Sequence, residues 1–157
     1  MCRKFFKLKL LASIVVFASV AVAGQKTKTV LPTPTEPAAA IRGTAAYAEI
    51  LLRKAETDAE LDALSADYTD DFPRIKELKF SAGLLTEDLA RLNSVKPEEV
   101  GRLTVALGKL MIRRLDAAIE LWKLRQSFAD NYPDVRRALR KWEIFDKAVK
   151  EILGQSK

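Results

Sequence analysis

The chain has 157 residues and a net charge of +6, with 27 basic and 21 acidic side chains, one Cys and no His. Without His, the sequence excludes an imidazole base, a His metal ligand and a Ser-His-Asp triad. The length suits a single domain. Only six Gly and six Pro are present, too few for a turn-rich all-β fold.

The first 23 residues have the pattern of an export signal. Four basic residues precede an apolar run over residues 10–23, which ends in Ala-Val-Ala, a pattern that signal peptidases accept. The run has fourteen residues, whereas a membrane-spanning helix needs about 20. We therefore expect residues 1–23 to be a cleaved signal peptide and the protein to be periplasmic or secreted. The alternative is an uncleaved N-terminal anchor, and only then would we expect membrane contact.

Cleavage would change the charge of the chain. The four basic residues leave with the signal, so 23 basic and 21 acidic residues remain, a net charge of +2. This balance does not support a nucleic-acid partner, and we predict none. Cys2 leaves as well, so the mature chain would have no thiol or disulfide.

Residues 24–43 are predicted to be a Pro/Thr-rich linker. Pro32, Pro34 and Pro37 alternate with Thr and Glu, a composition that favours an extended, solvated chain. Thr44 follows Gly43 and is a suitable N-cap for the first helix. We therefore place a helical domain at residues 44–157.

Apolar residues recur at steps of three and four throughout this domain. One such seam contains Ile75, Leu78, Ala82, Leu85, Leu89 and Leu92. This period is typical of helices that pack knobs-into-holes, and no stretch alternates as a half-buried strand does. The expected fold class is all-α.

Two similar turns indicate an internal repeat. Pro73 and Pro133 each follow an aromatic residue and lie 60 residues apart, and a shift of 60 aligns the two halves without gaps. We predict a duplicated antiparallel helical hairpin, with repeats at about 44–93 and 97–153, forming a four-helix bundle or coiled coil. Pro97, followed by two Glu residues, is expected to open the third helix.

The third helix is apolar on most sides. The residues outside its main seam that we predict to lie in an interface are Met111, Leu115, Ile119 and Trp122. A helix with this pattern is surrounded by other helices, which favours a compact bundle. In the alternative, the hairpins stay extended and this apolar surface serves self-association.

Two basic residues interrupt the apolar seams, and the hairpin register predicts their partners. Lys54 should lie near Glu87 and Asp88, and Arg114 near Asp146. These groups could form a charged ligand site. We favour the simpler interpretation, in which they are partly buried ion pairs that fix the register.

Few residues suggest binding chemistry. Arg136, Arg137, Arg140 and Lys141 form a basic run on the last helix, which is a candidate site for anionic lipid or acidic glycan or else a solvated helix face. The acidic turn at Asp67 to Asp71 lacks the ligand pattern of an EF-hand. We predict no catalytic residues, no metal site and no cofactor.

The sequence from Tyr68 to Ile75 (YTDDFPRI) and, less closely, that from Phe128 to Val135 resemble a turn of bacterial polysaccharide chain-length determinant (co-polymerase) proteins. In that family a Tyr-Thr-x-x-His-Pro-x-Val turn lies in a periplasmic coiled coil; here Phe72 and Tyr132 occupy the His position. The resemblance covers the turns and their flanking helices. It implies a cell-envelope scaffold linked to polysaccharide export.

Together these observations predict an exported, non-enzymatic helical scaffold or interaction protein of the cell envelope. Its expected partner is a second copy or another envelope protein. The alternative is a binding module for anionic lipid or acidic glycan that uses the basic run of the last helix.

Overall fold

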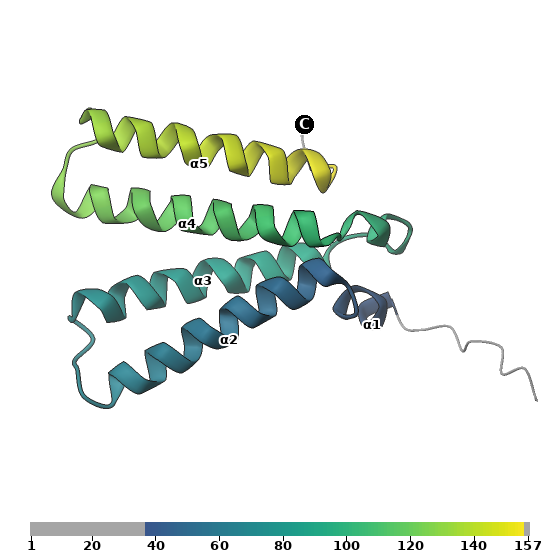
Figure 1. Ribbon diagram of the computed structural model, residues 1–157, viewed down its shortest axis with the longest axis horizontal. Coiled ribbons are helices and arrows are strands. Elements are labelled where there is room, and N and C mark those ends of the chain that lie inside the picture. The colour runs from purple at the N-terminus through teal and green to yellow at the C-terminus, as the bar shows by residue number, and fades with distance from the viewer. Residues whose placement is uncertain (1–36, 156–157) are drawn as a thin grey trace, which may run out of the picture. The chain divides into compact units, whose positions relative to one another are not determined.

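The computed structural model describes residues 37–155, which form helices joined by turns and contain no strand (Figure 1). The elements are α1 (Pro37–Arg42), α2 (Ala45–Ser65), α3 (Pro73–Asn93), the 3-10 helix η1 (Pro97–Arg102), α4 (Val105–Ser127) and α5 (Pro133–Ile152). The predicted all-α fold is confirmed. The predicted signal peptide and residues 24–36 of the predicted linker lie outside the described residues. No helix within residues 37–155 is long and apolar enough to cross a membrane.

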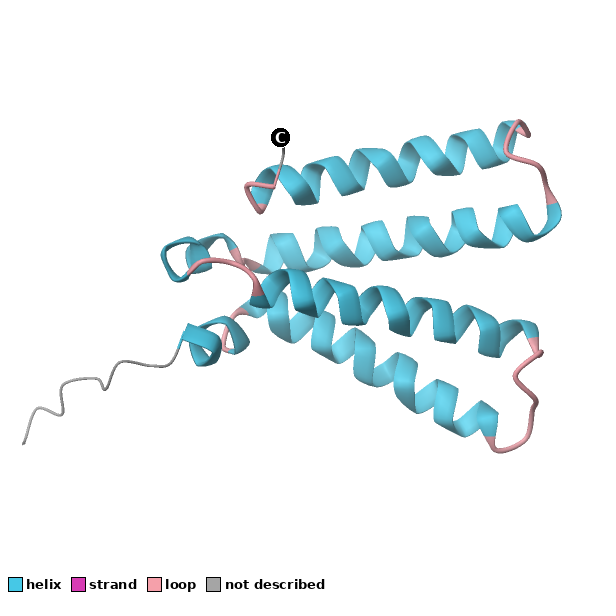
Figure 2. Ribbon diagram, turned by 180° about the vertical axis from the view of Figure 1, so that it is seen from behind, coloured by secondary structure: helices cyan, strands magenta, loops and turns pink. Residues whose placement is uncertain are grey.

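The helices form two antiparallel hairpins, the first from α2 and α3 and the second from α4 and α5. Both interhelical turns lie at the same end of the bundle (Figures 1 and 2). Pro73 and Pro133 are each the first helical residue after the turn, where a missing N–H costs nothing.

The two turns have nearly the same geometry. Tyr68 stacks on Phe72 and Phe128 stacks on Tyr132, each with 4.4 Å between ring centroids. The ring planes are 16° and 10° apart. The turns that indicated the repeat in the sequence therefore fold alike.

Helix α4 lies at the centre of the packing. It contacts α2, α3 and α5, whereas α5 packs principally on α4. The large side chains that are fully buried include Ile50, Leu85, Leu107, Met111 and Val149, which come from all four long helices. The compact bundle is thus confirmed, with α5 at its edge rather than enclosed.

Two predicted boundaries are wrong. The end of the expected linker is helical: Pro37 begins α1, three Ala residues favour the helix, and Ile41 is buried in the core. Pro97 opens the separate helix η1 and not the third long helix. That helix begins at Val105, because the Thr104 hydroxyl accepts a hydrogen bond from the Leu107 N–H and caps it there.

Candidate functional site

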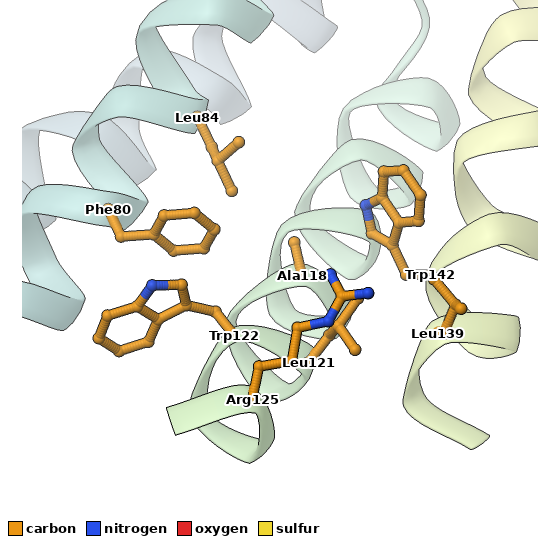
Figure 3. Close-up of a pocket in the computed structure, with 8 residues that line it drawn as sticks. All are labelled: Phe80, Leu84, Ala118, Leu121, Trp122, Arg125, Leu139 and Trp142. Carbon is orange, nitrogen blue, oxygen red and sulfur yellow. The ribbon is translucent and has the colours of Figure 1, made fainter. Parts of the chain in front are cut away.

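An apolar groove of about 250 Å³ opens over α4, between α3 and α5 (Figure 3). We call it the apolar groove. Its lining residues are Phe80 and Leu84 from α3, Ala118, Leu121, Trp122 and Arg125 from α4, and Leu139 and Trp142 from α5. Apolar side chains with a few polar groups at the margin are the usual composition of a binding site.

The packing of the helices explains why this groove is open. Helices α3 and α4 run antiparallel, and the Phe80 ring stacks on Trp122 with 5.3 Å between centroids. Because α5 packs principally on α4, its residues Leu139 and Trp142 form the opposite wall without closing on α3 (Figure 3). Of the lining residues, Arg125 is charged, and its Nε–H donates to Asp130 over 2.9 Å.

A buried charge cluster, made of Asp88, Arg114 and Asp146, joins α3 and α5 to α4. The guanidinium of Arg114 donates to Asp88 and, over 3.0 Å, to Asp146. Arg91 of α3 also lies 3.8 Å from the Asp146 carboxylate. Since Arg114 precedes Ala118 by one helical turn, the cluster lies at one end of the apolar groove.

The pKa values of the two carboxyl groups in the cluster are shifted in opposite directions. Burial raises the pKa of Asp88, and the charge and hydrogen bond of Arg114 only partly offset this. Burial also acts to raise the pKa of Asp146, but hydrogen bonds from Lys150 and Arg114 outweigh it, so that pKa lies below its ordinary value. The Arg114 pKa is raised, since the two carboxylates outweigh its own burial.

The register predictions for the basic seam residues have different outcomes. The Arg114–Asp146 pair is confirmed. The pairing of Lys54 with Glu87 or Asp88 is wrong, because Lys54 donates to Asp58 of its own helix over 2.6 Å. Asp88 is the partner of Arg114 across the two hairpins, a contact that the register within one hairpin could not predict.

The predicted basic run lies on the exposed side of α5, where Arg136, Arg137, Arg140 and Lys141 are all exposed. Two of these charges are already paired. Arg137 donates to Asp134, and Lys141 lies 2.7 Å from Glu120 of α4. Within the described part of the chain, Arg136 and Arg140 form no ion pair. The run therefore presents less unpaired positive charge than its sequence indicates.

The residues predicted to form an interface lie between the hairpins. Met111 and Leu115 are 0% and 1% exposed in the core, and Ile119 is partly buried against it. Trp122 is the member that reaches the apolar groove. Across residues 37–155, no cluster of three acidic, Cys or His side chains has the arrangement of a metal site.

Sequence analysis missed the apolar groove. Trp142 lies on the main apolar seam of its helix, a position that indicates core packing, but it is only partly buried and lines the groove. The sequence signal for the groove was that Phe80 and Leu84 lie outside the apolar seam of α3.

Comparisons of this chain with protein-family models, curated proteins and solved structures found no match.

Proposed function

We propose that this chain is an exported, non-enzymatic helical scaffold of the cell envelope that binds apolar side chains of another protein in the apolar groove. The observation that carries the proposal is the groove itself, with the aromatic side chains Phe80, Trp122 and Trp142 on its walls. Large aromatic side chains are enriched where proteins bind one another.

The groove suits a helix of a partner protein. Its walls are parts of three helices, and Arg125 is the charged residue among those that line it. An amphipathic helix that lies in such a groove buries apolar side chains spaced three and four residues apart. An acidic residue beside them would meet the Arg125 guanidinium, so the expected partner segment is apolar with an acidic flank.

Site-specific photocrosslinking in intact cells tests this proposal. A photoreactive residue at position 142, inside the groove, should give one discrete protein adduct; the same residue at the exposed neighbour position 143 should not. The substitution Ala118→Phe, which fills the groove, should abolish that adduct and the binding of the purified partner. Equal adducts from both positions, or none, would contradict the proposal.

Export and the link to polysaccharide depend on separate observations. Export is supported by the pattern of residues 1–23 and predicts a mature chain that begins at Gly24. N-terminal sequencing of the protein from envelope or medium checks this, and an intact Met1 would contradict cleavage. The resemblance of the two turns supports a setting in polysaccharide export, where loss of the chain should change the length distribution of surface polysaccharide.

A further inference from the structure

We infer that copies of this chain associate head to tail, with the exposed side of α2 of one copy packed on the α4–α5 side of the next. The inference deepens the proposed scaffold function, and it uses a surface separate from the apolar groove. It follows from the internal repeat, because the chain already contains one interface of this kind, between α4 and the first hairpin.

In that internal interface, one face of α4 packs on the first hairpin. The residues of this face are Gly108, Met111, Ile112, Leu115 and Ile119. Met111 and Leu115 join Ile50 and Leu85 in the core. A shift of 60 residues places the equivalent face on α2.

The equivalent face of α2 is exposed. It consists of small and apolar residues, namely Ala48, Leu51, Leu52, Ala55 and Ala59. Leu51 and Leu52 are 47% and 60% exposed, although they stand in the middle of a helix. Most other large apolar side chains that are exposed within residues 37–155 belong to turns or helix ends, with Ile144 of α5 the exception.

The receiving surface is repeated as well. Between α2 and α3, the space beside Glu60, Glu77 and Ser81 is only about 70 Å³, and Ile119 of α4 is among the residues that line it. The equivalent residues between α4 and α5 are Glu120, Arg137 and Lys141. They line an open groove of about 400 Å³, which we call the outer groove. Whereas the first space has a lining residue from α4, the residues that line the outer groove all belong to α4 and α5 themselves.

Charge complementarity supports the same pairing. Internally, Trp122 of α4 stacks on Phe80 of α3. The equivalent residues are Asp62 and Arg140, so the aromatic pair becomes an acid–base pair between two copies. Asp62 and Arg140 carry opposite charges, so they are complementary at the position where Trp122 and Phe80 meet internally.

A second pair keeps its charges under the same shift. Internally, Asp116 of α4 lies 3.8 Å from Arg53 of α2. The equivalents are Glu56 on the exposed side of α2 and Arg113 on the receiving side. The acidic side of α2 therefore meets the basic side of the second hairpin, so that basic residues of α5 face acidic residues of another copy.

The two interfaces differ in strength. Ala55 and Ala59 replace Leu115 and Ile119, so the interface between copies is less apolar than the internal one. Ala48 stands at the position equivalent to Gly108. In the internal interface, a Cβ added to Gly108 would lie 2.9 Å from the Glu49 Cβ, so the helices must lie slightly further apart at this point of the interface between copies. These changes predict reversible association that weakens with salt. Because the interface is heterologous, it extends beyond a dimer.

Analytical ultracentrifugation of the protein, purified from its native cells, tests the inference. The wild type should form a concentration-dependent series of oligomers. Leu52→Lys places a charge on the exposed face of α2, and Ile144→Lys places one on the α4–α5 side, one helical turn after Arg140. Each should weaken association by about tenfold or more. Val105→Lys, at a residue that is 45% exposed at the start of α4 and does not line the outer groove, is the matched control and should associate as the wild type does. Since all three side chains are exposed, the melting curves should stay nearly unchanged.

Mixing the two variants distinguishes head-to-tail pairing from a symmetric dimer. The Leu52→Lys chain keeps its α4–α5 surface and the Ile144→Lys chain keeps its α2 surface, so the mixture should form a heterodimer that grows no further. A wild type that stays monomeric, or a mixture without heterodimer, would overturn the inference. Monomers in which Ile144→Lys strengthens binding to anionic vesicles would also overturn it and would assign the basic run to an anionic ligand. Ala118→Phe should leave self-association intact, so failure of the apolar groove and failure of this interface are distinguishable.

Discussion

The two hairpins of this protein share a plan but differ in how each is covered. Both begin with a helix capped by Thr, turn through a stacked aromatic pair and resume at Pro. Helix α4 covers the first hairpin, whereas α5 packs principally on α4 and leaves its other side exposed. The comparison shows that the two hairpins have the same turn geometry but differ in which of their faces another helix covers.

The difference is clearest at one pair of equivalent positions. Lys54 and Arg114 both interrupt an apolar seam. The Lys54 side chain is 25% exposed and pairs with Asp58 of its own helix, whereas the Arg114 side chain is 4% exposed and bridges two other helices. Equivalent positions of the repeat thus form a surface ion pair in one hairpin and a buried ion-pair bridge between helices in the other.

The largest predicted effect comes from removing the ion pairs of Arg114. Arg114→Met leaves Asp88 and Asp146 buried without their guanidinium partner, and we expect the free energy of unfolding at neutral pH to fall by about 3–5 kcal/mol. Urea denaturation measures it. Lys54→Met removes an i,i+4 surface pair and should cost about 0.3–0.5 kcal/mol. Similar losses in the two variants would show that the hairpins do not differ in this respect.

A replacement that tests the electrostatics alone is Asp146→Asn. The variant loses charge-assisted hydrogen bonds to Arg114 and Lys150, at a cost of about 1.5–3 kcal/mol. Since folding lowers the Asp146 pKa below its ordinary value of 3.8, its carboxylate stabilises the fold above that pH. The stabilisation is lost as the pH falls through the folded-state pKa.

The difference between wild type and Asp146→Asn should therefore be full at neutral pH and shrink in acid. The contribution of Asp88 to stability changes with pH in the opposite direction. Because folding raises its pKa, protonation of Asp88 favours the folded state at low pH, and this contribution is lost as the pH rises. Unfolding curves measured from neutral pH to below 3.8 check the trend. A difference that grows toward acid would show that the Asp146 pKa is raised.

Two glycines sharpen the comparison between covered and uncovered helices. A Cβ on Gly108 would lie 2.9 Å from the Glu49 Cβ and 3.1 Å from the Ala46 Cα, so Gly108→Ala must push α4 from α2. We expect it to destabilise by about 1–3 kcal/mol. A Cβ on Gly83 of α3 would have no neighbour within 4 Å, so Gly83→Ala should instead stabilise by about 1 kcal/mol. Thermal unfolding that shifts both variants in the same direction would contradict the close contact of α2 and α4.

The accuracy of the sequence predictions follows from the range of the interactions. The turns at Pro73 and Pro133 were predictable because Pro, Asp and an aromatic residue fix them locally. The Arg114–Asp146 pair followed from the register of one hairpin. The Arg114–Asp88 pair and the apolar groove did not, since both depend on how the hairpins pack. A periodic seam such as that of Trp142 shows which face is apolar, but not whether a neighbour covers it.

The last prediction compares the two helix caps. The hydroxyls of Thr44 and Thr104 each accept a hydrogen bond of 3.3 Å from a backbone N–H of the first turn, so Thr→Ala should cost about 1 kcal/mol at either position. Thr44 also donates to the Ile41 carbonyl over 2.7 Å and thereby joins α1 to α2. Thr44→Ala should therefore cost about 0.5–1.5 kcal/mol more than Thr104→Ala. Equal losses in urea denaturation would mean that α1 adds nothing to the stability of the first hairpin, and the caps would then be as alike as the turns.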